Sequence, residues 1–92
     1  MKLTSIKIDA QTTTKIEIEC TSFNSPFDAY LLEKDAVDEY ENTINSISPI
    51  ITAVRTIPIN SKGQVDLLNI SELGKYLIVW DSNKGELDHK LG

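Results

Sequence analysis

Short turn segments recur through the last third of the chain, and their spacing constrains the fold more than any other feature of the sequence. Residues 60–63 read NSKG, 71–74 read SELG and 82–85 read SNKG. Such residues favour tight turns, because Gly adopts a positive φ at no steric cost and short polar side chains bond nearby backbone. The runs around these turns are rich in β-branched and aromatic residues. They predict four consecutive strands, arranged as a meander.

The N-terminal third shows the two-residue period of a strand with one buried face. Between residues 15 and 20, Ile16, Ile18 and Cys20 alternate strictly with charged side chains. Residues 3–8 alternate less regularly, and the polar break after them predicts a hairpin or an edge-crossing turn. Cys20 is the only cysteine, so no intrachain disulfide forms. Its register with Ile16 and Ile18 predicts a buried structural thiol.

A helix is one interpretation of residues 26–47. Ser25, Pro26 and Asp28 supply an N-cap, a first-turn proline and a first-turn carboxylate. No Gly or Pro follows until Pro49, so local propensity predicts a helix. This interpretation leads to an α+β fold, in which helix 26–47 packs on an antiparallel sheet.

A strand is the other interpretation of the start of this segment. Residues 27–33 read FDAYLLE, which matches a strand with Tyr30 and Leu32 on one face. We expect the strand, with a short helix within 35–47 as an insertion between sheets. The α+β fold remains the alternative.

Length and composition indicate one globular domain. Of the 92 residues, 40% are hydrophobic and 25% are charged, which are ordinary values for a folded protein. A chain of this length builds a single modest core, so we expect one β-sandwich domain over residues 1–92. The net charge of −5 and the scattered Lys and Arg residues argue against a nucleic-acid binder, which needs a basic face.

A family resemblance supports the all-β interpretation. Thr56, NSKGQV at 60–65 and LLNISELGKYLIVW at 67–80 resemble the second half of immunoglobulin-like β-sandwiches of the prealbumin or Cna-B type. In those domains an Asn-x-x-Gly turn precedes a strand, and Gly-Lys-Tyr opens the next strand after a short bend. The resemblance implies an antiparallel immunoglobulin-like sandwich of about seven strands.

Four residues are expected to have structural roles in this sandwich. Gly63 and Gly74 supply the positive φ that a tight turn and a change of sheet require. Tyr76 is expected to enter its strand with its ring inward and its hydroxyl bonded to backbone at the corner, and Trp80 to lie in the core. The expected core consists of Ile6, Ile8, Ile16, Ile18, Tyr30, Leu32, Val54, Ile57, Leu67, Ile70, Tyr76, Ile78 and Trp80.

Catalytic constellations are nearly absent from the sequence. His89 is the only histidine and lies close to the last residues given, where a solvated side chain is expected. A Cys20, His89 and carboxylate triad needs an exposed thiol, whereas the alternation points Cys20 inward. The isolated glycines form no phosphate loop, and one Cys with one His makes no zinc site. We expect no enzyme, no cofactor and no metal.

The acidic run EKDAVDEYE, residues 33–41, is the candidate protein-binding surface. It lacks the Gly of a calcium loop, so a solvated face or a docking surface for a basic partner is expected rather than a metal site. Its acidic residues are Glu33, Asp35, Asp38, Glu39 and Glu41.

Two functional hypotheses follow. The first is a non-enzymatic structural or protein-interaction module, such as an accessory, decoration or adhesion-type domain of a bacterial or phage assembly. Its partner is another protein or a second copy, and the apolar run 50–59 is a pairing edge unless it is central. The second is an acidic inhibitor that docks on a basic groove of a host nucleic-acid enzyme.

The expected surroundings are the same for both hypotheses. No apolar run reaches the length of a signal-peptide core or a membrane span. We therefore expect a cytoplasmic or virion-associated protein, with no signal peptide and no transmembrane segment in this chain. We also expect no nucleic-acid partner and no membrane insertion.

Overall fold

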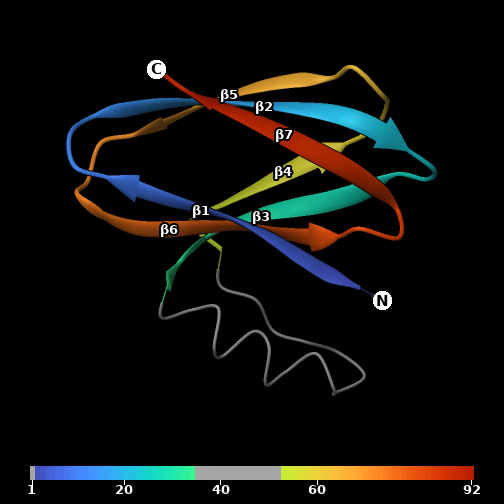
Figure 1. The fold of residues 1–92 in the computed structure, drawn as a ribbon, viewed down its shortest axis with the longest axis horizontal. Helices are drawn as coiled ribbons and strands as arrows, with labels where there is room; N and C mark the ends of the chain where they lie inside the picture. Colours follow the sequence, from blue (N-terminus) through green and yellow to red (C-terminus); the bar gives the residue numbers. More distant parts are fainter. Residues whose placement is uncertain (1, 35–52) are drawn as a thin grey trace.

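The protein has an all-β, sandwich-like fold, as predicted. The computed structural model describes residues 2–34 and 53–92, which form seven antiparallel strands in two sheets (Figure 1). The strands are β1 (Leu3–Ala10), β2 (Thr14–Phe23), β3 (Phe27–Glu33), β4 (Arg55–Ile59), β5 (Val65–Ile70), β6 (Gly74–Asp81) and β7 (Gly85–Leu91).

The chain crosses repeatedly between the two sheets. One sheet has the order β1-β6-β3-β4 and the other has the order β5-β2-β7. Among the described strands, β3 and β4 are the one pair of consecutive strands that are also neighbours. The predicted meander is therefore wrong, and the connection from β1 to β2 is the crossing turn rather than the hairpin. Local turn chemistry marks where a strand ends, but long-range pairing decides which strand lies beside it.

Strand β3 resolves the two interpretations of the middle segment. Residues 27–33 lie between β4 and β6, pairing with both. A helix that begins at residue 26 is therefore wrong over this stretch, because sheet pairing on two sides overrides the local helix-start signal. The short helix expected within 35–47 lies outside the described residues.

The main core fills the space between the sheets. Ile16, Ile18 and Cys20 of β2 point inward, which confirms the alternation seen in the sequence. The largest fully buried side chain is Trp80, whose indole Nε1 donates a hydrogen bond of 3.0 Å to the Gly85 carbonyl. This bond satisfies the indole N–H, which would otherwise be costly to bury.

Two expected core residues are exposed instead. Leu67 is 63% exposed, because the inward residues of β5 are Leu68 and Ile70. Period two forbids Leu67 and Ile70 from sharing a face. Val54 is 57% exposed and precedes the first residue of β4.

The set of β3 side chains that point into the main core also differs from the prediction. Its inward residues are Phe27, Ala29 and Leu31, which pack in the main core. Tyr30 and Leu32 lie on the opposite face of the same sheet, where Leu32 forms a smaller buried cluster with Leu77 and Val79. Both faces of β3 are therefore apolar, so alternation alone does not fix which face turns inward.

Among residues 2–34 and 53–92, no helix is long and apolar enough to cross a membrane.

Candidate functional site

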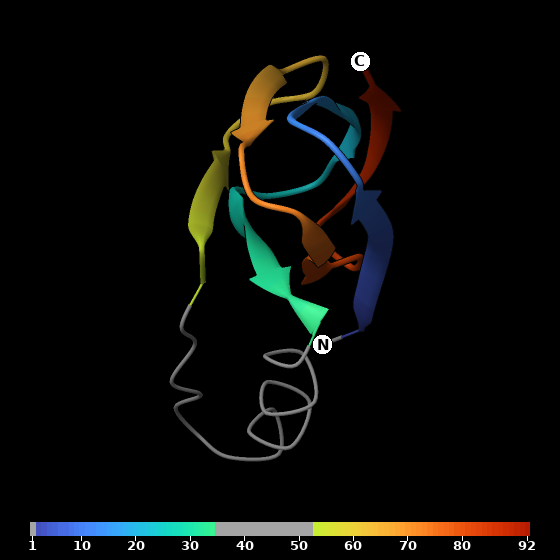
Figure 2. The same ribbon diagram turned by 90° about the vertical axis from the view of Figure 1, so that its left-hand side faces the viewer.

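The four edge strands lie in two pairs on opposite sides of the sandwich. Figure 2 shows β4 and β5 on one side and β1 and β7 on the other. An edge strand has one row of backbone amide and carbonyl groups without a strand partner, and another chain can pair with that row. We call the free edges of β4 and β5 the blocked side, and those of β1 and β7 the open side.

On the blocked side, the free edge of β4 is interrupted at Pro58 and Asn60. The Val54 amide donates to the Leu31 carbonyl, so odd-numbered residues of β3 turn their backbone groups toward β4. Pro58 lies opposite Asp28, an even-numbered residue, and so does not bond β3. Pro58 therefore turns its nitrogen outward, where it offers no N–H. The side-chain nitrogen Nε2 of Gln64 donates to the Pro58 carbonyl at 2.7 Å. The side-chain oxygen Oε1 of Gln64 accepts from the Asn60 backbone amide at 2.9 Å.

The free edge of β5 is blocked at its centre by Arg55. The Cys20 backbone amide donates to the Gln64 backbone carbonyl, so even-numbered residues at this strand bond β2. The backbone N–H and C=O groups of Leu67, an odd-numbered residue, therefore point away from β2. The Arg55 guanidinium donates to the Leu67 carbonyl at 3.1 Å and to the Asp66 carboxylate at 2.9 Å. One arginine therefore occupies the free edge of β5 and ties the two sheets together.

On the open side, β1 presents an uninterrupted edge. The bond from the Ser82 amide to the Lys2 carbonyl shows that even residues of β1 pair with β6, so the odd residues turn their backbone groups outward. Within residues 2–34 and 53–92, no side chain bonds those groups. The strand contains neither Pro nor Gly, and its pairing with β6 has no register shift. The outward residues are Leu3, Ser5, Lys7 and Asp9.

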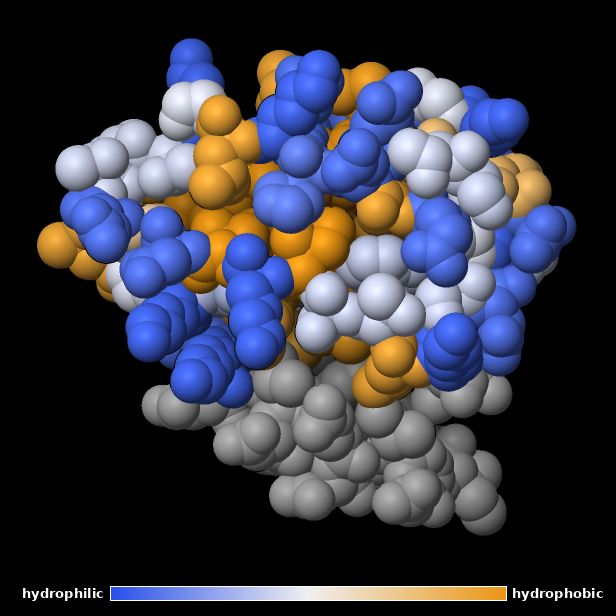
Figure 3. All heavy atoms as spheres, viewed as in Figure 1, coloured by the Kyte–Doolittle hydropathy of each residue, from blue (hydrophilic) through white to orange (hydrophobic). Residues whose placement is uncertain are grey.

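The second strand of the open side, β7, is less regular. Its register with β2 shifts between Cys20 and Ser22, and the His89 amide is already bonded by the Asp88 carboxylate at 2.8 Å. Leu91 is 55% exposed at its end. Figure 3 shows apolar surface between hydrophilic side chains on the face where Figure 1 places β1 and β7. Of the two strands, β1 is the better template for strand pairing.

The structure makes the expected pairing edge an edge strand, but one with obstructions along it. The run 50–59 contributes β4, which is an edge strand, but its free edge carries Pro58 and the Gln64 side chain. The open edge belongs to β1, whose alternation in the sequence is imperfect. Pro58 was the available sequence signal for a blocked edge, whereas the Gln64 and Arg55 bonds depend on the fold.

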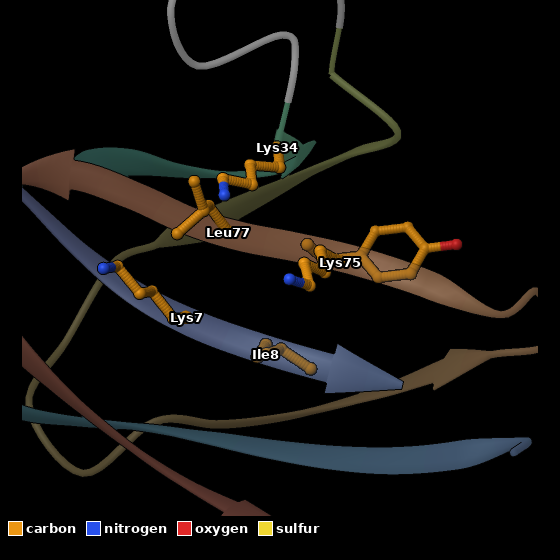
Figure 4. Close-up of a pocket in the computed structure, with 6 residues that line it drawn as sticks. Lys7, Ile8, Lys34, Lys75 and Leu77 are labelled. Atoms are coloured by element: carbon orange, nitrogen blue, oxygen red, sulfur yellow. The ribbon is translucent and has the colours of Figure 1, made fainter. Parts of the chain in front are cut away.

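Three lysines that are distant in the sequence gather at one hollow beside the open side. Lys7 of β1, Lys75 of β6 and Lys34 after β3 line a hollow of about 280 Å³ whose other described lining residues include Leu77 (Figure 4). In the described residues none of the three forms an ion pair. The expectation that basic residues are scattered is therefore wrong at this place. Their ammonium groups make the hollow locally positive on a chain of net charge −5.

The predicted acidic surface is described at one residue only. Glu33 is exposed at the end of β3 and lies opposite Tyr76 in the pairing with β6. The remaining acidic residues of the run lie outside the described residues: Asp35, Asp38, Glu39 and Glu41. The described part contains all nine Lys and Arg residues and ten of the 14 Asp and Glu residues, so its own formal charge is −1.

The predicted structural residues lie at the turns and in the core. Gly63 has φ of 78° and Gly74 has φ of 153°, both in the region that favours glycine. The Tyr76 ring is buried, and its hydroxyl donates to the Glu72 carbonyl at 3.2 Å. Trp80 lies in the core as described above.

Cys20 and His89, the two candidate catalytic residues, lie in different environments. Cys20 is buried, its thiol donates to the Ser22 carbonyl at 3.1 Å, and burial raises its pKa. His89 is half-buried on β7, opposite Ile18 rather than Cys20. In the part of the chain that the structure describes, no three His, Cys, Asp or Glu side chains group together as metal ligands would.

No family model matches the chain, and comparison with curated proteins and with solved structures gives no significant match.

Proposed function

We propose that the chain is a non-enzymatic structural or protein-interaction module, such as an accessory, decoration or adhesion-type domain of a bacterial or phage assembly. The observation that carries this proposal is the difference between the two sides of the sandwich. Pro58, Gln64 and Arg55 obstruct the blocked side, whereas the outward groups of β1 on the open side have no such obstruction. Proteins blunt edges that must stay unpaired, so an edge left intact is suited to strand addition by a protein partner.

A proline substitution tests the proposal directly. Ser5→Pro removes an outward amide of β1 without removing a bond to β6, because Ser5 lies at a position that does not bond β6. Thr56→Pro is the matched control, since it changes an outward amide of β4 on the blocked side. The tagged wild-type chain and both variants are used as baits in lysate of the native source, and recovered proteins are identified by mass spectrometry.

The expected result is a protein partner that the wild type and Thr56→Pro recover and Ser5→Pro does not. Equal recovery by all three folded baits contradicts a role for the β1 edge. Turnover of a small-molecule substrate at an enzymatic rate contradicts the non-enzymatic module. Cytoplasmic or virion-associated location belongs to the same proposal and is checked by fractionation.

A second candidate is an acidic inhibitor that docks on a basic groove of a host nucleic-acid enzyme. It is favoured by the charge distribution, since residues 35–41 carry four of the acidic side chains and no basic one. It ranks second because the described sandwich is nearly neutral and because Lys34 and Lys75 line one hollow together with Glu33, the one described acidic residue of the run. Its test replaces Asp35, Asp38 and Glu39 by Lys; binding to a basic protein that survives this change excludes it.

A further inference from the structure

We propose that the occupant of the open edge is β1 of a second copy of this chain. The two β1 strands pair antiparallel across a two-fold axis at Ile8, which joins two four-stranded sheets into one continuous sheet. This inference rests on the proposed function, in that both need the β1 edge to be the interaction site. It goes further by naming the partner and the register.

Backbone geometry allows this pairing. The outward groups of Ser5, Lys7 and Asp9 alternate at the two-residue period that an antiparallel partner requires. A two-fold axis at any residue from Leu3 to Asp9 brings outward residues opposite each other, and the axes at Ile6, Lys7 and Ile8 use the middle of the strand. Side chains decide among them, because a two-fold axis makes every contact occur twice.

Charge selects the axis at Ile8. In this register Lys7 of each copy lies opposite Asp9 of the other, so two opposite-charge pairs form on the outer face of the sheet. An axis at Lys7 places the two Lys7 side chains opposite each other, which is unfavourable. An axis at Ile6 places Lys7 opposite Ser5 and forms no charge pair directly across the strands. Both Lys7 and Asp9 are exposed and available.

Apolar contact on the inner face agrees with the same register. Ile6 is only partly buried at the edge of the main core, although it lies on the inward face of β1. With the axis at Ile8, Ile6 lies opposite Ala10 of the second copy, and the two Ile8 residues face each other. Pairing therefore covers the apolar side chain that the single chain leaves incompletely buried.

Charge exchange is the sharpest test. Lys7→Asp and Asp9→Lys each create two like-charge pairs in the dimer, whereas the double variant restores two opposite-charge pairs. Sedimentation equilibrium is run up to about 1 mM protein, because a single strand pair is a small, weak interface. We expect each single variant to weaken dimerisation by about tenfold and the double variant to return within about threefold of the wild type.

A measurement on the unaltered chain guards against misfolded variants. Amide hydrogen exchange of Lys7 and Asp9, which lie opposite each other in the paired strands, is expected to slow by about tenfold or more as the protein concentration rises. The amides of Ile6 and Ile8 provide an internal control, because β6 already bonds them in the monomer. Concentration-independent exchange at both Lys7 and Asp9 overturns the inference.

The outcomes separate this inference from the proposed function. A monomer at every concentration, or a double variant as weak as the single ones, overturns pairing of two copies at Ile8. If that monomer still captures a partner that Ser5→Pro loses, the proposed function stands and only the second copy is excluded. If neither self-association nor Ser5-dependent capture is found, both fail.

Discussion

Arg55 and Asp66 form an ion pair of 2.9 Å that joins the edge strands of two different sheets. The same guanidinium donates to the Leu67 carbonyl, so it has both a structural and a protective role. Arg suits this position because its fork of N–H groups reaches a carboxylate and a carbonyl together, which a Lys ammonium on a flexible stem does less well.

Arg55→Ala is expected to have a small effect on stability and a larger effect on association. Because the Arg55 side chain is 45% exposed, the lost pair is worth only about 0.5 to 1 kcal/mol in the free energy of unfolding. Freeing the Leu67 carbonyl unblocks β5, whose outward side chains Val65 and Leu67 are apolar and exposed. Urea unfolding measures the first effect and light scattering the second. Asp66→Asn is the control: it loses the ion pair but keeps Leu67 covered, so it should not associate.

Gly85→Ala is expected to destabilise the fold through a clash rather than through backbone strain. A methyl group at Gly85 meets the Ser22 carbonyl and the Phe27 ring, and a backbone carbonyl cannot move aside cheaply. We expect a loss of about 1 to 3 kcal/mol in the free energy of unfolding, measured in urea. Gly63→Ala provides the contrast, because open space surrounds Gly63 and its φ of 78° is the only obstacle. Equal stability of Gly85→Ala and wild type would mean that the β6–β7 corner is more pliable than the packing implies.

The sequence predicted strands better than it predicted their neighbours. The alternation of Ile16, Ile18 and Cys20 and the turn at Gly63 are local signals, and both correspond to the structure. Which strands pair depends on contacts between distant parts of the chain. The meander failed for that reason, since crossing between sheets uses the same Asn, Ser and Gly turn residues as a hairpin.

The candidate site could not be predicted from the sequence, for a similar reason. The outward direction of the Ser5 backbone follows from the register of β1 with β6, which no local pattern contains. Lys7, Lys34 and Lys75 converge because three strands bring them to one hollow. Tyr30 was assigned to the wrong face since both faces of β3 are apolar. Of these residues, only Pro58 carried a signal in the sequence, because a proline within a strand indicates an edge strand.

The Cys20 thiol is expected to be unreactive in the folded chain. The side chain is buried, and burial raises its pKa, so less thiolate is present than in a free cysteine at the same pH. Labelling by a disulfide reagent at pH 8 should be at least about a hundredfold slower folded than in urea. A Cys20→Ala chain carrying Thr21→Cys is the matched control, because Thr21 is the exposed neighbour. Equal labelling of the two folded chains would reopen the Cys20 nucleophile hypothesis.

The Asp81 carboxylate is expected to make the fold sensitive to acid. It accepts hydrogen bonds from the Lys2 amide at 3.1 Å and the Asn83 amide at 3.0 Å. Burial acts to raise the pKa of Asp81, but these two amides and the nearby Lys84 ammonium together hold it below its ordinary value. The folded chain therefore binds this proton more weakly than the unfolded chain does.

The sign of the pH dependence follows from that difference. The stabilisation by Asp81 is complete above the unfolded pKa of about 3.9 and is lost as the pH falls through the lower folded value. Asp81→Asn keeps an oxygen acceptor and removes the charge, so the wild type should be the more stable chain at pH 7. Urea unfolding of both chains from pH 7 to pH 2.5 should show their difference shrinking below about pH 4, because the other carboxyl groups are common to both. A difference that stays constant across this range would mean that the amides of Lys2 and Asn83 hold the side chain by geometry alone, with no contribution from its charge.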